Sequence, residues 1–250
     1  MQQSPDERQI LGIKFYVGDV QGVFERLSGG GLLVVPAAPA LKDVAVSVEY
    51  RDALTNADVA IADSAFMVML WNWMQRDSIP RLSGLKYLRA LLQRRDVRER
   101  GNTFWVMAGA RSAEKNVDWL RAEGIEIPED HIYIAPMYGS EIHDQQLVDS
   151  LERLRPAHVV ITVGGGTQER LGLYLKRNLS YLPAIHCIGA AIAFLSGDQV
   201  KIPHWADSLY LGWLFRCVSA PRRFIPRYLS APKLIPLLWR YREQIPTSQV

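Results

Sequence analysis

The sequence predicts an α/β protein built on a mostly parallel β-sheet with helices on both faces. Short apolar runs alternate with longer helix-like segments along most of the 250 residues. This alternation is typical of parallel strands joined by helical crossovers. The runs are apolar at consecutive positions, which is expected for strands that are covered on both faces.

Six runs are expected to be strands, at 30–37, 57–63, 103–109, 131–137, 158–165 and 184–191. The segments between and around them are expected to be helical, at 40–55, 66–76, 85–98, 113–123, 143–155 and 168–180. The order of these elements predicts a Rossmann-like sheet.

The composition indicates an ordinary globular chain, with 48% hydrophobic and 22% charged residues. Cys187 and Cys217 are the only cysteines, which excludes a disulfide framework or a zinc site and favours a reducing compartment. The N-terminus lacks the pattern of a signal peptide, and no run of eighteen uncharged apolar residues is present. We therefore expect no transmembrane helix.

The C-terminal stretch differs from the rest of the chain. Residues 208–242 contain seven basic residues and no Asp or Glu, with Trp and Phe interspersed. We expect a core at 1–207 and a basic, aromatic, helical appendage at 208–250 that contacts an anionic surface. The alternative is a packed helical segment whose arginines are only solvated.

Ligands of such sheets bind at the carboxyl ends of the strands, so the residues that follow each strand are candidates. Asp63 directly follows the strand expected at 57–63 and precedes a helix. Its carboxylate can act as a general base or can cap the next helix, and its position alone leaves both open.

Three consecutive glycines, Gly164, Gly165 and Gly166, follow the strand at 158–165. They form neither a Walker A loop nor a dinucleotide fingerprint. Glycines let the backbone approach a ligand and donate N–H groups, although a tight turn would need them too. Gln168 and Glu169 fall in the first turn of the next helix, facing whatever the loop holds.

Seven segments together resemble one family. They are ILGIKFYVGDVQGVFERL, TNADVAIADSAFMVML, RLSG, VMAGARSAEK, VGGGTQER, IGAAIAFLSGDQVKIPHW and LGWLFRCVSAPRRFIPRYL. Their order and spacing resemble the WecG/TagA/CpsF family of bacterial glycosyltransferases (glycosyltransferase family 26), over about residues 10–230.

The resemblance implies an inverting transfer of a sugar from a UDP-sugar to a polyprenyl-diphosphate-linked acceptor. It implies Asp63 as the general base, with Arg222 and Arg223 as further catalytic residues that stabilise the leaving UDP. It implies substrate binding by Arg81, Gly109, Gly164, Gly165, Gly166, Gln168, Glu169, Gly189 and Arg216. No cofactor or obligatory metal is expected, because no DxD-type carboxylate pair lies in a suitable loop.

The expected partners follow from the same resemblance: a UDP-sugar, a lipid-linked glycan acceptor and the anionic inner-membrane surface, with the protein peripheral on its cytoplasmic face. A homo-oligomer is compatible with the sequence, and nucleic acid is not expected as a partner.

Several polar residues of the family pattern are replaced here, by Ala38, Ala193, Gly212 and Ala220. These losses favour either a different donor sugar or a catalytically weakened member that serves as a partner subunit of another transferase. A nucleotide-binding protein that binds nucleic acid is a third class, suggested only by the basic C-terminal stretch.

Overall fold

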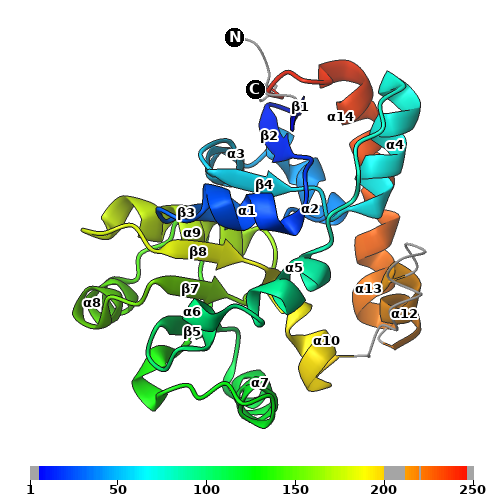
Figure 1. Ribbon diagram of the computed structural model, residues 1–250. Helices are drawn as coiled ribbons and strands as arrows, with labels where there is room; N and C mark the ends of the chain where they lie inside the picture. Colours follow the sequence, from blue (N-terminus) through cyan, green and yellow to red (C-terminus); the bar gives the residue numbers. More distant parts are fainter. Residues whose placement is uncertain (1–5, 200–211, 220, 247–250) are drawn as a thin grey trace.

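The protein folds around one eight-stranded sheet with helices on both faces, as Figure 1 shows for the computed structural model, which describes residues 6–199, 212–219 and 221–246. The strand order is β1-β2-β4-β3-β8-β7-β5-β6. All neighbouring strands pair in parallel except β1 and β2, which are antiparallel. The expected α/β fold with a mostly parallel sheet is therefore confirmed.

The strands are β1 (Glu7–Ile10), β2 (Ile13–Tyr16), β3 (Gly31–Val34), β4 (Val59–Ile61), β5 (Thr103–Met107), β6 (Ile132–Ile134), β7 (His158–Ile161) and β8 (Ala184–Cys187). The helices up to residue 199 are α1 (Val20–Arg26), α2 (Ala38–Leu41), α3 (Val48–Thr55), α4 (Ala65–Gln75), α5 (Gly84–Leu91), α6 (Arg95–Arg98), α7 (Ala110–Ala122), α8 (Gln145–Leu154), α9 (Thr167–Asn178) and α10 (Ala193–Ser196). The C-terminal helices are α12 (Gly212–Ser219), α13 (Pro221–Leu229) and α14 (Leu234–Tyr241).

The six expected strands are present, and the differences lie elsewhere. Residues 7–16 form a hairpin, because Leu11 and Gly12 both have positive φ, at 52° and 78°, as a two-residue turn requires. The helix expected at 85–98 is split into α5 and α6. Arg94 between them is extended, and the break turns Val97 into the core.

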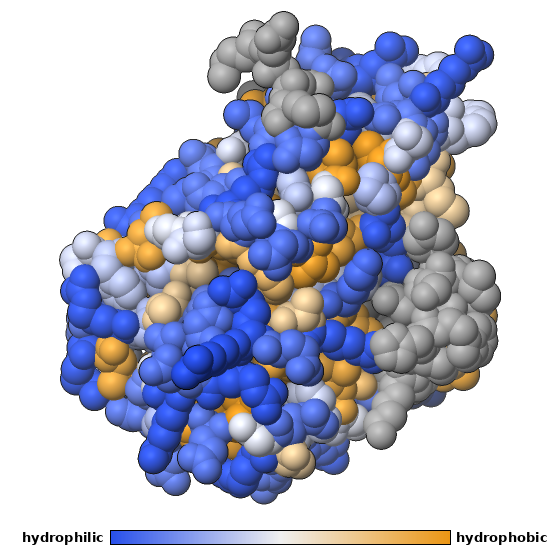
Figure 2. Space-filling view, viewed as in Figure 1, coloured by the Kyte–Doolittle hydropathy of each residue, from blue (hydrophilic) through white to orange (hydrophobic). Residues whose placement is uncertain are grey.

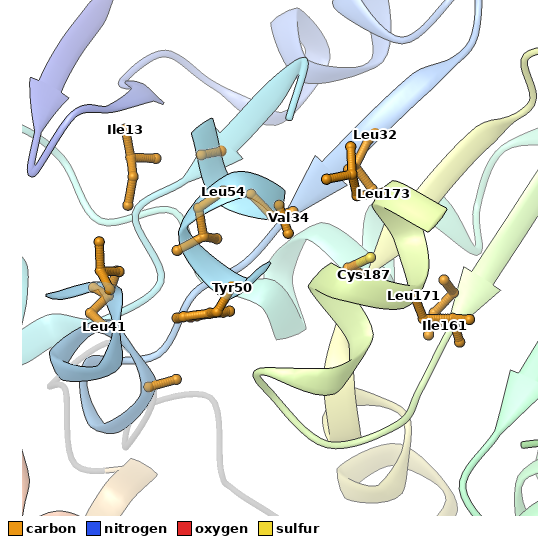
Figure 3. Close-up of a cluster of buried hydrophobic side chains, with 14 of the residues drawn as sticks. Ile13, Leu32, Val34, Leu41, Tyr50, Leu54, Ile161, Leu171, Leu173 and Cys187 are labelled. Atoms are coloured by element: carbon orange, nitrogen blue, oxygen red, sulfur yellow. The ribbon is translucent and has the colours of Figure 1, made fainter. Parts of the chain in front are cut away.

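Each face of the sheet has its own apolar core. Along β5, Phe104 and Val106 pack on one face, whereas Trp105 and Met107 pack on the other. Figure 3 shows the first face, where α3 and α9 cover β3, β7 and β8. The contact of α9 with the sheet requires glycine at residue 172, since a Cβ there would lie 2.6 Å from the Cys187 sulfur.

The last described helix belongs to this core. Leu234 and Leu238 of α14 are fully buried in the same cluster as Leu41 and Met67. The Leu11 N–H also donates to the Arg242 carbonyl at 2.7 Å, which ties the first hairpin to the end of α14. The division of the chain at residue 207 stays a prediction, but Ala231, Leu234 and Leu238 belong to the core that covers one face of the sheet.

Leu238→Ala should therefore lower the free energy of unfolding by about 2–5 kcal/mol, the usual loss for a large buried side chain. The exposed neighbour Trp239→Ser is the control and should change it by no more than about 0.5 kcal/mol. Denaturant unfolding followed by circular dichroism measures both. Equal, small changes would mean that α14 is peripheral.

A row of hydrogen-bonded, buried polar side chains lies on the second face of the sheet, the face of Trp105 and Met107. The Tyr87 hydroxyl lies 2.9 Å from His186 Nδ1, and His186 Nε2 lies 3.2 Å from His158 Nδ1. Burial lowers the pKa of His186 well below its ordinary value and also lowers that of His158, where the nearby Asp96 carboxylate opposes the shift. Both histidines are therefore neutral in the folded protein near pH 7.

In the unfolded chain these imidazoles take up protons near pH 6.5. The unfolded state therefore binds more protons below that pH, so the stability contributed by neutral His186 is present above it and is lost as the pH falls. Between pH 7 and pH 5 the free energy of unfolding should therefore fall, in part through His186. The free energy of unfolding, measured with urea at several pH values in this range, should depend less on pH in His186→Gln than in the unchanged protein. The same pH dependence in both proteins would contradict a neutral, buried His186.

Candidate active site

The carboxyl ends of the parallel strands form one edge of the sheet, and most of the predicted site residues lie along it. Asp63 follows β4, the three glycines follow β7, Gly189 follows β8 and Gly109 follows β5. Neighbouring strands lie about 4.8 Å apart, so three strand intervals put Asp63 and Gly164 roughly 14 Å apart. A ligand that meets both must be elongated.

Asp63 does not cap the helix that follows it. Ser64 is the N-cap of α4 and accepts a hydrogen bond from the Met67 N–H. Asp63 Oδ1 instead accepts from the Gly84 N–H at 3.0 Å, in the first turn of α5. The positive end of α5 is therefore directed at this carboxylate.

Arg81 completes the surroundings of Asp63. Its Nε donates to the Asp63 backbone carbonyl at 2.6 Å, and its NH2 group lies 3.5 Å from Oδ1. Both side chains are only partly exposed. Within the described residues the other carboxylate oxygen, Oδ2, has no hydrogen-bond partner. One oxygen is thus anchored while the other can accept a proton.

The glycine loop presents backbone donors. Gly164 and Gly165 are exposed, and Gly166 has a φ of +90° that favours glycine. In the part of the chain that the structure describes, the N–H groups of Gly164, Gly165 and Thr167 are not hydrogen-bonded. With the N-terminus of α9 behind them, these groups suit an anion.

The side chains of Gln168 and Glu169 are buried and point into the protein. Glu169 accepts from the Gly166 N–H at 2.6 Å, and Gln168 accepts from the Gly189 N–H at 2.5 Å. Gly189 has a φ of +60°, so it too favours glycine. These contacts shape the loops after β7 and β8. Direct substrate contact by the two side chains stays a prediction.

Arg170 is a site residue that sequence reasoning did not single out. Its Nε donates to the Gly166 carbonyl at 3.0 Å, and its NH1 group donates to the carbonyls of Gly139 and Ser140. Arg170 therefore fastens the glycine loop to the loop that follows β6. The only signal in the sequence was its place in the first turn of α9.

Gly109 is the N-cap of α7, where it is half-buried and where a Cβ would meet nothing within 4 Å. Its backbone is extended, so this position does not demand glycine. Its open surroundings are compatible with the predicted substrate contact, which stays a prediction.

Helix α12 is the part of the C-terminal segment that contacts the candidate site. Phe215 of α12 packs on Leu85 and Phe194, next to the α5 turn that holds Asp63. This contact brings the predicted basic segment to the candidate site. Arg222 is exposed on α13. The side chains of Arg216 and Arg223 lie outside the described residues, and the roles of all three arginines stay predictions.

Two of the replaced family residues are buried: Ala38 begins α2 and Ala193 begins α10. Gly212 starts α12, and residue 220 lies outside the described residues. Among the described residues, no three His, Cys, Asp or Glu side chains are grouped to hold a metal ion. No helix in this part of the chain has both the length and the apolar character to cross a membrane.

Comparison with known proteins gives the family. Residues 8–247 match the profile described as Glycosyl transferase WecG/TagA/CpsF family. The chain is also 23% identical, over 82% of its length and 77% of the relative's, to a Bacillus spizizenii protein named N-acetylglucosaminyldiphosphoundecaprenol N-acetyl-beta-D-mannosaminyltransferase. The chain belongs to the WecG/TagA/CpsF family of glycosyltransferases.

Asp63→Asn should lower the rate of glycosyl transfer by roughly 10²–10⁴-fold, because the amide cannot take a proton yet still accepts from the Gly84 N–H. The Michaelis constant for the donor should change little. Ser64→Ala is the matched control: losing the α4 cap should cost about 1 kcal/mol of stability and leave most of the rate. Full activity of Asp63→Asn would reduce Asp63 to a structural role.

Proposed function

We propose that this chain is an inverting, metal-independent glycosyltransferase. It would move a sugar from a UDP-sugar to a polyprenyl-diphosphate-linked acceptor in bacterial exopolysaccharide, capsule or teichoic-acid-type synthesis. The proposal is supported by membership of the family and by the relative, whose name states a diphosphoundecaprenol acceptor. The observation that carries it is the Asp63 carboxylate, which is anchored through Oδ1 and whose Oδ2 accepts no hydrogen bond from the described residues.

The proposed reaction is a single displacement. Oδ2 of Asp63 takes the proton of the acceptor hydroxyl as that oxygen bonds to the anomeric carbon of the donor. The bond from this carbon to the UDP oxygen breaks on the opposite side, so the configuration inverts. The Arg81 and Gly84 contacts keep the carboxylate oriented throughout.

The leaving UDP gains negative charge, which must be neutralised. The N–H groups of Gly164 and Gly165, which have no acceptor within the part of the chain that the structure describes, are suitable donors at a helix N-terminus. Arg216, Arg222 and Arg223 are proposed to add positive charge, supported by the packing of α12 beside α5. The distance of roughly 14 Å between Asp63 and the loop fits an extended sugar nucleotide better than a small anion.

The proposed partners and location follow from the acceptor. A lipid-linked acceptor is held at a membrane, so the chain would work as a peripheral protein on the cytoplasmic face of the inner membrane. The basic residues of 208–242 support an anionic surface as a partner.

Release of UDP tests the proposal. With a UDP-sugar and an acceptor carrying polyprenyl-diphosphate-linked N-acetylglucosamine, UDP should appear only when both substrates are present. Excess EDTA should leave the rate nearly unchanged, since arginines and backbone N–H groups replace a metal in this scheme. Complete loss of activity, restored by Mg²⁺ or Mn²⁺, would refute metal independence.

The same assay decides the alternative of a weakened partner subunit. That alternative is favoured by the buried alanines Ala38 and Ala193 where the family pattern has polar groups. Donor binding by calorimetry without any UDP release, across a panel of UDP-sugars, would support it against the proposed transferase.

A further inference from the structure

Helix α4 is apolar on all sides although part of it faces solvent. Of its eleven residues, AFMVMLWNWMQ, only Asn72 and Gln75 are polar. The Asn72 amide is turned inward, where it donates to the Ile79 carbonyl and accepts from the Ile79 N–H, both at 3.0 Å. A helix of this kind is normally buried in a core or in a membrane. Met69 and Trp73 are nevertheless 54% and 74% exposed.

Helix α14 packs beside α4 and also exposes apolar side chains (Figure 1). Leu234 and Leu238 hold it to the core, while Ile235 and Trp239 are 41% and 63% exposed. Residues four apart lie on the same side of a helix, so each of the two helices presents one exposed apolar pair.

We call Met69, Trp73, Ile235 and Trp239 the α4–α14 edge. Figure 2 shows apolar surface on the upper right side of the molecule, where Figure 1 places α4.

The helices that carry this edge contain no acidic residues, and the acids next to them in the chain are Asp77 and the exposed Glu243. Neither α4 nor any of α12, α13 and α14 contains an Asp or Glu. Exposed basic residues directly follow α4 or lie in α14 and at its two ends: Arg76, Lys233, Arg240 and Arg242. Asp77, the nearest acid after α4, is already bound by Arg8 and by the Trp71 indole N–H.

An apolar edge with a cationic rim fits a lipid surface with anionic headgroups. Trp side chains favour the membrane–water interface, and basic residues beside them are attracted to negative lipids. A second copy of the chain is a poorer occupant, because pairing this edge with itself would bring two cationic rims together.

We propose that the α4–α14 edge inserts into the headgroup region of an anionic lipid monolayer. This deepens the proposed function, on which it rests for the membrane-held acceptor. Half of the surface comes from α4, far from the basic C-terminal segment in the sequence. Since α4 starts directly after Asp63 and Ser64, insertion would fix the base relative to the membrane. Trp73 lies ten residues after Asp63, about 15 Å along the helix axis.

Co-sedimentation with vesicles tests the surface without any sugar substrate. The vesicles are phosphatidylcholine, with or without phosphatidylglycerol. The intact chain should bind the anionic vesicles, and binding should fall with added salt. Two double variants remove the edge, Met69→Ser with Trp73→Ser and Ile235→Ser with Trp239→Ser. Each should weaken the partition into vesicles at least about tenfold, because two large apolar groups no longer leave water.

The matched control is Ile134→Ser with Met137→Ser, two exposed apolar residues in and after β6, at the opposite end of the sheet from the hairpin that contacts the end of α14. It should bind vesicles like the intact chain, and all variants should keep their thermal melting. Unchanged binding by either edge variant would overturn the proposal. Edge variants that bind vesicles normally but turn a dimer into a monomer in sedimentation would make the edge a self-association face and also overturn it.

A water-soluble acceptor analogue separates this proposal from the proposed function. The edge variants should release UDP from it at the rate of the intact chain, since they leave the site untouched. If no form of the chain released UDP while the edge still governed vesicle binding, the transferase proposal would fail and the membrane surface would stand.

Discussion

The hydrogen bond from the Gly84 N–H to Asp63 Oδ1 is the contact on which the candidate site depends. It joins the end of β4 to the first turn of α5, although the long helix α4 lies between them in the chain. Arg81 reinforces it by binding the Asp63 carbonyl. The carboxylate is thereby fixed at the edge of the sheet, and α4 packs against α14.

The glycine loop after β7, at the other end of the site, is also held by hydrogen bonds between side chains and backbone groups. Gln168, Glu169 and Arg170 are consecutive, and each binds a different loop segment: Gly189, Gly166 and the 139–140 turn. Because the carboxylate and amide are used internally, the loop can offer its own N–H groups to a ligand. Preorganised donors of this kind are most effective when they need not move during the reaction.

The fold was predictable because consecutive apolar positions identify buried parallel strands, as in His158–Ile161 and Ala184–Cys187. The Leu11–Gly12 hairpin was missed, because its strands are short and its turn carries only one glycine. Asp63 and the glycine loop could be located from their places after strands. Their partners could not, since Gly84 lies 21 residues from Asp63 and an inward-facing Gln168 has the same sequence signature as an outward-facing one.

The packing of α14 into the core was also not predictable from the sequence pattern. Basic residues and prolines made 208–250 look separate, yet Leu234 and Leu238 fill the core beside α4. Residue composition does not distinguish the exposed face of a helix from its buried face. A segment with a basic exposed face and an apolar buried face can therefore be taken either for an appendage or for part of the core. The two sides of α14 have different consequences here. The buried leucines hold the chain end against α4, and the exposed Ile235 and Trp239 extend the apolar surface that α4 begins. Helix α4, which follows Asp63, is thus stabilised by α14, and the two helices together form the α4–α14 edge.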